Sequence, residues 1–161
     1  MIEEFLTRDH DRKSFDCGSH EINEFLRRYA RQNAAMGVAQ TFVLVAPQQP
    51  RTILGYYSLS TAQIDFEQIS EAHRGRLPKY PVPAARMGRL GVDRRHHGKG
   101  IGSRLLGLAI RRCQAIRKEI GLVVLAVDAK DDTAAAFYRH HGFTPVEEKP
   151  HTLYLPLELL E

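Results

Sequence analysis

The sequence predicts an α/β (α+β) fold with a mixed central β-sheet and helices on both of its faces. Leu122 to Val127 is a continuous apolar run, as expected for a central strand that is covered on both sides. Ser103 to Ile120 repeats apolar residues with the period of a helix. With 161 residues, 43% of them apolar, the chain can build one sizeable core, so we expect a single domain over residues 1–161.

The first half of the chain predicts one helix and a hairpin. Ser19 is a good N-cap, and an apolar helical stripe follows it through Ile22, Phe25, Leu26 and Tyr29. Two β-rich runs, Thr41 to Ala46 and Thr52 to Ser60, are separated by Pro47-Gln48-Gln49-Pro50, which cannot continue a ladder and predicts a turn. We expect a short third strand near Ala62 to Phe66, then an ordered surface loop over Glu67 to Pro83 with room for a short helix.

The second half alternates strands and helices. Arg86 to Val92 is the next expected strand, and the long helix from Ser103 is expected to stop at Gly121. Its inward side chains are expected to be Leu105, Leu106, Ala109, Ile110, Cys113, Ile116 and Ile120. Asp131 or Asp132 can cap a helix from Thr133 to His141, which Gly142 closes, and His151 to Leu157 is the last expected strand.

Composition excludes several classes of protein. The two cysteines, Cys17 and Cys113, belong to no metal-ligand spacing, so we expect buried thiols rather than a zinc site or disulfide framework. Met1 to Phe5 does not resemble a signal peptide, and no apolar run is long enough to span a bilayer. We therefore expect a cytoplasmic protein with no membrane association.

The most informative stretch is the glycine-rich turn from Arg95 to Ser103, which joins a predicted strand to the long helix. Gly98, Gly100 and Gly102 allow several backbone N–H groups to converge on one anion, beside the positive end of the helix dipole. The turn therefore predicts a phosphate site. A P-loop is excluded because Asp93 stands where its first glycine belongs, and a dinucleotide fingerprint is weak because Ser103 follows Gly100-x-x.

From Arg95 the stretch matches Arg/Gln-x-x-Gly-x-Gly/Ala and resembles the pyrophosphate motif of the GNAT superfamily of acetyltransferases. Downstream, Ala136 to Phe143 is similar to the late helix of that superfamily, where a Phe-Tyr pair precedes Gly-Phe. The resemblance implies a GNAT fold with splayed strands 4 and 5, and acetyl-CoA as the cosubstrate. It also implies that Tyr138 is the catalytic acid that protonates the coenzyme thiolate, although a tyrosine on an apolar helix face can also be a core residue.

The same resemblance supplies the expected coenzyme contacts. The strand backbone would pair with pantetheine and the loop would surround the pyrophosphate. The residues concerned are Leu90, Gly91, Val92, Arg95, His97, Gly98, Lys99, Gly100, Ile101, Gly102, Ser103 and Phe137.

A narrower resemblance covers nearly the whole chain. Phe15-Asp16-Cys17-Gly18, Asn23-Glu24-Phe25-Leu26, Gly55 to Ser60 and Gly88 to Asp93 are similar to acetyltransferase toxins of bacterial type II toxin–antitoxin modules. This implies acetylation of the α-amino group of aminoacyl-tRNA, a block of translation, a ribbon-helix-helix antitoxin and a homodimer. An α-amine with a pKa near 8 or below needs no strong base, and Asp93 and Asp128 are expected to have capping or paired roles.

The net charge of +4 is modest, and some of the cations would neutralise the negative charge of the coenzyme. The remaining cations could form a solvated face or hold tRNA phosphates. The candidate tRNA contacts are Arg27, Arg28, Arg31, Arg74, Arg76, Lys79, Arg86 and Arg89.

Other functions stay open from the sequence. His96-His97 and His140-His141 lack further ligands at metal spacing, so we expect no metal. A GNAT enzyme that acts on a small-molecule or protein amine would share every coenzyme feature. A binding module that keeps the fold without catalysis is a further alternative. The sequence does not indicate which aminoacyl-tRNA would be the acceptor.

Overall fold

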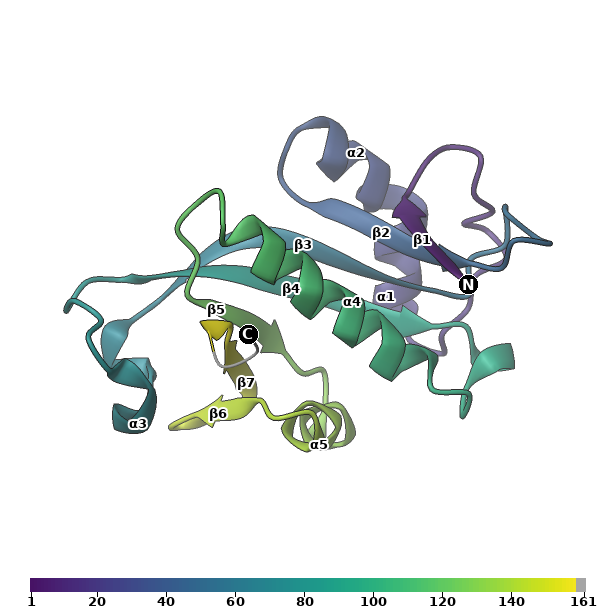
Figure 1. Cartoon of the computed structure of the whole chain (residues 1–161). Helices are drawn as coiled ribbons and strands as arrows, with labels where there is room; N and C mark the ends of the chain where they lie inside the picture. Colours follow the sequence, from purple (N-terminus) through teal and green to yellow (C-terminus); the bar gives the residue numbers. More distant parts are fainter. Residues whose placement is uncertain (159–161) are drawn as a thin grey trace. The chain divides into compact units, whose positions relative to one another are not determined.

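The computed structural model describes residues 1–158, which divide into two compact units (Figure 1). The first unit contains residues 1–60 and 88–109, and the second contains residues 61–87 and those from 110 onward. The strands β3 (Gly55–Ile64) and β4 (Val82–Val92) and the helix α4 (Ile101–Ile116) each contribute residues to both units. The seven strands of the described residues form one sheet in the order β1-β2-β3-β4-β5-β7-β6. The prediction of a mixed sheet is confirmed, although the number and order of its strands were not predicted.

The first unit contains an antiparallel set of strands. The edge strand β1 (Ile2–Phe5) pairs with β2 (Gln40–Val45), which pairs in turn with the start of β3. Before β2 the chain forms α1 (His20–Glu24), a π-helical segment η1 (Phe25–Tyr29) and α2 (Ala30–Ala35). After β4 come the 3-10 turn η3 (Arg94–His96) and the first turns of α4.

Gly55 and Tyr56, neighbours at the start of β3, show how helices cover both faces of the sheet in this unit. Successive strand residues point to opposite faces. Tyr56 stacks on Phe25 of η1 with 6.5 Å between ring centroids and donates a hydrogen bond to the Ile22 carbonyl at 2.6 Å. A Cβ atom built at Gly55 would lie only 2.7 Å from Leu105 Cδ1 of α4. The prediction of helices on both faces is confirmed.

Several predictions for this part of the chain need correction. The hydroxyl of Ser19 caps α1 by accepting from the Ile22 N–H, as expected, but Tyr29 is half exposed rather than part of the apolar stripe. The π-helical turn of η1 shifts the helical register, and this explains why the simple period fails at its last residue. The four-residue strand β1 was not predicted, because so short a segment carries no clear periodicity.

The second unit holds the parallel part of the sheet. β5 (Val124–Asp128) runs parallel to β4 from Ala84 opposite Val124 to Met87 opposite Val127, and β4 continues beyond this paired segment to Val92. β5 also pairs antiparallel with β7 (Lys149–Pro156), which pairs with β6 (Thr144–Val146). β5 is apolar throughout its buried residues, as predicted for a central strand.

The connection between β3 and β4 differs from the prediction. Residues 62–64 continue β3 instead of forming a third strand, and η2 (Phe66–Gln68) is a 3-10 turn. The expected loop does contain a short helix, α3 (Glu71–Arg74), but β4 begins at Val82, earlier than predicted. Val82 is buried in a cluster with Ile64, Ile69 and Tyr154, and this packing explains the early start.

The long helix α4 is shorter than predicted. Leu105, Leu106, Ala109 and Cys113 are fully buried, as expected. The helix ends at Ile116, and Ile120 is 62% exposed, so its predicted inward position is wrong. The chain turns after Ile116 through hydrogen bonds to its carbonyl oxygen, before Gly121 is reached.

The last helix, α5 (Asp132–His140), is capped by Asp131, whose carboxylate accepts from the Ala134 N–H at 2.8 Å. Gly142 has a φ of +92° and follows the helix, as predicted. β6 was not predicted because its three residues include a proline. Within residues 1–158, no helix has the length and apolar character needed to cross a membrane.

Close packing at Gly55 predicts opposite effects for two glycine substitutions. Gly55→Ala should destabilise the protein by about 1–3 kcal/mol, because its Cβ would also lie 3.0 Å from the Gly91 carbonyl oxygen. Gly107→Ala, in the interior of α4 with no atom within 4 Å of the new Cβ, should stabilise it by about 0.5–1 kcal/mol. Urea unfolding of both variants measures the contrast. Equal stability of the Gly55 variant and wild type would mean that the neighbours move aside freely.

Candidate functional site

The glycine-rich turn lies between η3 and α4 in the first unit. Gly98 and Gly100 have φ values of +79° and +76°, which other residues rarely adopt. A Cβ built at either position would meet no atom within 4 Å, so the loop surface above these glycines is open. Glycine is needed here because of the positive φ and not because of a lack of space. The first turn of α4 leaves its N–H groups without intrahelical acceptors. An open loop of this shape at a helix N-terminus fits a phosphate or pyrophosphate.

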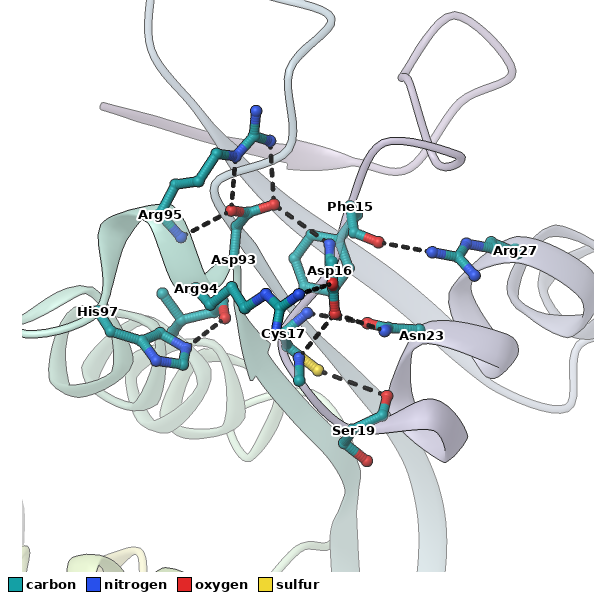
Figure 2. A network of polar contacts seen from close by, with 12 residues as sticks. Phe15, Asp16, Cys17, Ser19, Asn23, Arg27, Asp93, Arg94, Arg95 and His97 are labelled. Atoms are coloured by element: carbon teal, nitrogen blue, oxygen red, sulfur yellow. Dashed lines mark hydrogen bonds and ion pairs between the residues drawn. The ribbon is translucent and has the colours of Figure 1, made fainter.

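The start of this loop is fixed by Asp93, which is only 1% exposed (Figure 2). Its carboxylate accepts hydrogen bonds from the backbone N–H of Arg95 at 3.0 Å and of Asp16 at 3.2 Å. The Arg95 guanidinium adds two more, from Nε at 2.9 Å and Nη2 at 3.1 Å. Burial by itself would raise the pKa of Asp93, but these hydrogen bonds and the charge of Arg95 outweigh it and lower the pKa to about 2.

Asp16 joins the segment before α1 to the start of the glycine-rich loop. Its carboxylate accepts from the side-chain amide of Asn23 and from the N–H of Gly18, both at 2.9 Å, and pairs with the Arg94 guanidinium at 3.0 Å. The amide oxygen of Asn23 in turn accepts from the Cys17 N–H at 2.9 Å. The N-terminal segment and the entrance of the phosphate loop therefore form one hydrogen-bonded network (Figure 2).

The end of β4 lies under this network. A Cβ at Gly91 would be 2.8 Å from Ile22 Cγ2 and 3.4 Å from the Cys17 side chain, so only glycine allows this close approach. The Val92 carbonyl faces His97 Nε2 at 2.8 Å. Of Leu90, Gly91 and Val92, the predicted pantetheine contacts, Gly91 therefore lies against α1 and Cys17, and Val92 contacts the glycine-rich turn.

The other predicted coenzyme residues occupy the exposed part of the loop. Lys99 Nζ lies 3.2 Å from His96 Nδ1, and the Lys99 side chain is otherwise directed to solvent. Arg95 is 61% exposed, but its guanidinium is paired with Asp93. The charge of Arg95 therefore stabilises the buried Asp93 carboxylate at the start of the same loop.

Tyr138 lies on α5 in the second unit and is 6% exposed. Its ring contacts Phe137 edge to face at 5.3 Å and Phe143 at 5.6 Å between centroids. Burial raises the pKa of Tyr138 well above the ordinary value for tyrosine, and the negative charge of Asp128 raises it further. The phenol therefore keeps its proton at any physiological pH.

Asp128, at the end of β5, belongs to a second polar cluster in that unit. It pairs with Arg86 and accepts from the Thr152 hydroxyl at 3.2 Å. Arg86, Asp128 and Thr152 line a pocket of about 310 Å³, together with further polar residues of β3 and β7. The prediction that Asp93 and Asp128 have capping or paired roles is confirmed.

Several of the predicted tRNA contacts bind other groups of the protein itself. Arg27 donates to the Phe15 carbonyl at 3.0 Å, Arg28 pairs with Glu24 at 2.6 Å, and Arg74 donates to the Ile69 carbonyl at 2.9 Å. The Arg89 guanidinium lies 4.2 Å above the Phe25 ring. Arg31, Arg76 and Lys79 are exposed, on α2 and in the segment after α3. Several of these cations therefore stabilise the fold, whatever else they bind.

The sequence did not indicate the role of Asn23 or the contact of Asp16 with Asp93. Both residues lie in stretches that carry the resemblance, but nothing in the spacing of Asp16 and Asp93 indicates that they meet. The described residues contain no group of three or more His, Cys, Asp or Glu side chains arranged around a metal ion.

Comparison with known proteins agrees with this geometry. The model of the acetyltransferase (GNAT) domain matches residues 39–145. A tRNA-acetylating toxin of Mycobacterium tuberculosis is 35% identical over 133 residues, which are 83% of this chain and 78% of the relative. The chain belongs to the GNAT acetyltransferase family.

Two solved structures are similar over 99% of this chain. AtaT complexed with acetyl-methionyl-tRNAfMet has a TM-score of 0.92 and 27% identity, with 96% of that chain covered. A mutant of the AtaT toxin, bound to the C-terminus of the antitoxin AtaR and to acetyl-CoA, has a TM-score of 0.82 and 28% identity, also with 96% covered.

The Asp93 network predicts a pH-dependent loss of stability. The folded-state pKa of Asp93, about 2, lies below the ordinary value of 3.8 for aspartate, so its contribution to the free energy of unfolding is present above about pH 4 and is lost as the pH falls toward 2. Asp93→Asn should cost roughly 1–3 kcal/mol at neutral pH and much less near pH 2. Asp131→Asn is the control, since asparagine is an equally good N-cap. Denaturant unfolding across this pH range checks the difference.

The backbone conformation of the loop predicts a specific effect on the coenzyme. Gly100→Ala should raise the KM for acetyl-CoA by about tenfold or more, because alanine resists a φ of +76° and would move the loop N–H groups. The melting temperature should change little, since the new Cβ meets no neighbour. An unchanged KM would contradict the assignment of this loop to the coenzyme.

Proposed function

We propose that this protein transfers the acetyl group of acetyl-CoA to the α-amino group of aminoacyl-tRNA and acts as the translation-blocking toxin of a type II toxin–antitoxin system. The open glycine loop at the N-terminus of α4 is the observation that carries the acetyl-CoA assignment. The acceptor assignment rests on the relative that is a tRNA-acetylating toxin and on the similarity to AtaT in its complex with acetyl-methionyl-tRNAfMet.

The loop would bind the pyrophosphate of the coenzyme through backbone N–H groups between Gly98 and Ser103. Lys99 and Arg104 are exposed there and can neutralise phosphate charge. Arg94 and Arg95 contribute less, because each is paired with an aspartate. The backbone of Leu90, Gly91 and Val92 would make the pantetheine and oxyanion contacts. Acetyl-CoA supplies the thioester that the acceptor amine attacks.

Tyr138 would act as the general acid. When the amine nitrogen has attacked the thioester carbonyl, the C–S bond breaks and the coenzyme leaves as a thiolate, which takes the phenolic proton. A buried phenol with a raised pKa is reliably protonated before this step. The attacking nitrogen carries an extra proton in the tetrahedral intermediate and loses it as the amide forms. That proton passes to the phenolate directly, or it passes to solvent and the phenolate takes a proton from solvent.

No strong base is required for an aminoacyl ester, because its α-amine has a pKa of about 8 or below and a substantial fraction of it is neutral at cellular pH. This agrees with the carboxylates described above, since Asp93 and Asp128 are both engaged with arginines. A proton leaving the amine can therefore pass to water.

The same proposal includes the assembly and location of the protein. We propose that residues 1–161 act as one domain, because β3, β4 and α4 each contribute to both compact units. The proposal also includes a ribbon-helix-helix antitoxin and a homodimer, as the resemblance to acetyltransferase toxins implies, and a cytoplasmic location, where tRNA is found. The AtaT complex with the AtaR C-terminus supports an antitoxin partner.

The test is incubation of the purified protein with labelled acetyl-CoA and a pool of charged tRNA. Uncharged tRNA and a panel of polyamines are the controls. Label in charged tRNA alone, released as N-acetylated amino acid on deacylation, would support the proposal and identify the acceptor. Transfer to polyamines or to protein would support the assignment as an acetyltransferase but contradict the proposed toxin role.

Loss of the proton donor predicts a defect in turnover rather than in binding. Tyr138→Phe should lower kcat by roughly 10²–10⁴-fold and leave the KM for acetyl-CoA within about a factor of three, since phenylalanine keeps the ring contacts with Phe137 and Phe143. Phe143→Leu is a matched control that disturbs the same packing but keeps the hydroxyl. Wild-type turnover of the Tyr138 variant would rule out its role as the acid.

A further inference from the structure

A strongly basic pocket of about 630 Å³ lies in the first unit, and none of its lining residues is among those assigned to the coenzyme. Its cationic side chains come from the segment after β1, from η1 and from the connection between β2 and β3. They are Arg8, Arg12, Lys13, Arg27 and Arg51. Asp11 is the one carboxylate among the described lining residues, so the pocket carries a large excess of positive charge.

The backbone around this basic pocket is firmly held. Asp11 N–H donates to the Arg51 carbonyl at 2.7 Å, and Asp11 forms a β-bridge with Thr52. The Asp11 carboxylate accepts from the Ser14 N–H at 3.2 Å. The nearly buried His10 accepts from the Thr7 N–H at 3.0 Å through Nδ1 and contacts Glu4 at 2.6 Å through Nε2. The segment that carries three of the cations is therefore preorganised.

Two of the guanidinium groups are fixed as well. Arg27 donates to the Phe15 carbonyl, and Arg12 donates to the Arg27 carbonyl at 2.9 Å (Figure 2 shows the Arg27 contact). Each guanidinium has five N–H donors, so a single bond of this kind orients the group and leaves other donors for a ligand. Arg8, Lys13 and Arg51 are exposed.

The chemistry of the lining favours phosphates over a peptide. The described residues that line the basic pocket have no aliphatic or aromatic side chain, apart from the imidazole of His10. Protein and peptide partners usually depend on buried apolar anchors, whereas phosphodiester backbones are held by Arg, Lys and hydroxyl groups. A volume of about 630 Å³ is ample for more than one phosphate.

We propose that the basic pocket binds the phosphodiester backbone of the RNA acceptor. This inference rests on the proposed function for the identity of the RNA. Of the cations in the basic pocket, only Arg27 was among the tRNA contacts predicted from the sequence. It also gives the N-terminal segment, which precedes the matched GNAT region, a role in selecting a polyanionic acceptor.

The test variant is Arg8→Gln/Lys13→Gln/Arg51→Gln, which spares Arg12 and Arg27 because they bond to backbone carbonyls. Binding of labelled uncharged tRNA is followed by fluorescence anisotropy over a range of salt concentrations. Each lost phosphate contact should lower the slope of log Kd against log salt by about 0.9, so we expect a loss of about 2–3 in slope. The Kd near 0.1 M salt should rise by about tenfold or more.

The kinetic readout separates this pocket from the catalytic steps. The KM for the aminoacyl-tRNA should rise in parallel with the Kd, while kcat at saturation and the KM for acetyl-CoA stay unchanged. An aminoacylated oligonucleotide that ends in CCA and lacks the stem should be acetylated equally by wild type and variant. If wild type acetylates no aminoacyl-tRNA, the proposed function fails, and the anisotropy arm still tests the pocket.

Two control proteins define the result. Arg111→Gln/Lys118→Gln/Lys130→Gln removes the same formal charge from exposed positions elsewhere and should change the slope by less than about 1. Arg8→Lys/Arg51→Lys keeps the charge and should retain the wild-type slope. Melting temperatures of all variants should stay close to that of wild type, and a test variant that unfolds is replaced by the single Arg8→Gln and Lys13→Gln proteins.

Three outcomes would overturn the proposal. An unchanged salt slope in the test variant would show that tRNA does not use the pocket. A raised KM for acetyl-CoA would assign the pocket to phosphates of the coenzyme instead. Binding of a polyglutamate peptide as tight as that of tRNA, with the same dependence on the three cations, would make it a site for acidic protein segments.

Discussion

Asp93 is a carboxylate placed almost out of water at the point where β4 ends and the phosphate loop begins. A buried charge is unfavourable unless hydrogen bonds and an opposite charge replace its hydration. Here the replacement comes from Arg95, two residues on, and from the backbone of Asp16, far away in sequence. Because both partners are needed, the entrance of the loop and the segment before α1 can hold their positions only together.

This dependence explains how basic residues are used in the protein. Arg94, Arg95, Arg86 and Arg27 are each bound to a carboxylate or a carbonyl of the chain itself. The net charge counts all cations equally, but a cation that is already bound to a carboxylate or carbonyl of the chain is less available to a phosphate ligand. The exposed cations Arg8 and Lys13 of the N-terminal segment are not among those bound in this way, and they lie outside the region that the GNAT model matches.

The division of labour follows from this arrangement. The matched region supplies the sheet, the glycine loop and α5 with Tyr138, which are the parts that an acetyl transfer from a coenzyme needs. The preceding residues pack against the end of β4 at Gly91 and, together with Arg51 and Thr52 of the matched region, line the basic pocket. Most of the cations of that pocket therefore come from outside the part of the chain that carries the glycine loop and Tyr138.

The sequence by itself determined the features that depend on local patterns. The glycine turn, the buried strand near Leu122, the Ser19 and Asp131 caps and the position of Tyr138 on a helix were all predictable, because each reflects propensity or periodicity within a few residues. The element ends were less predictable, as at Ile120, because the point where a helix stops depends on the surrounding turn. Tertiary structure alone decided that Asp16 meets Asp93, that Gly91 lies against Ile22, and that Arg51 joins Arg8 and Lys13. These contacts join residues from separate segments, and no spacing in a single chain records which distant groups the fold brings together.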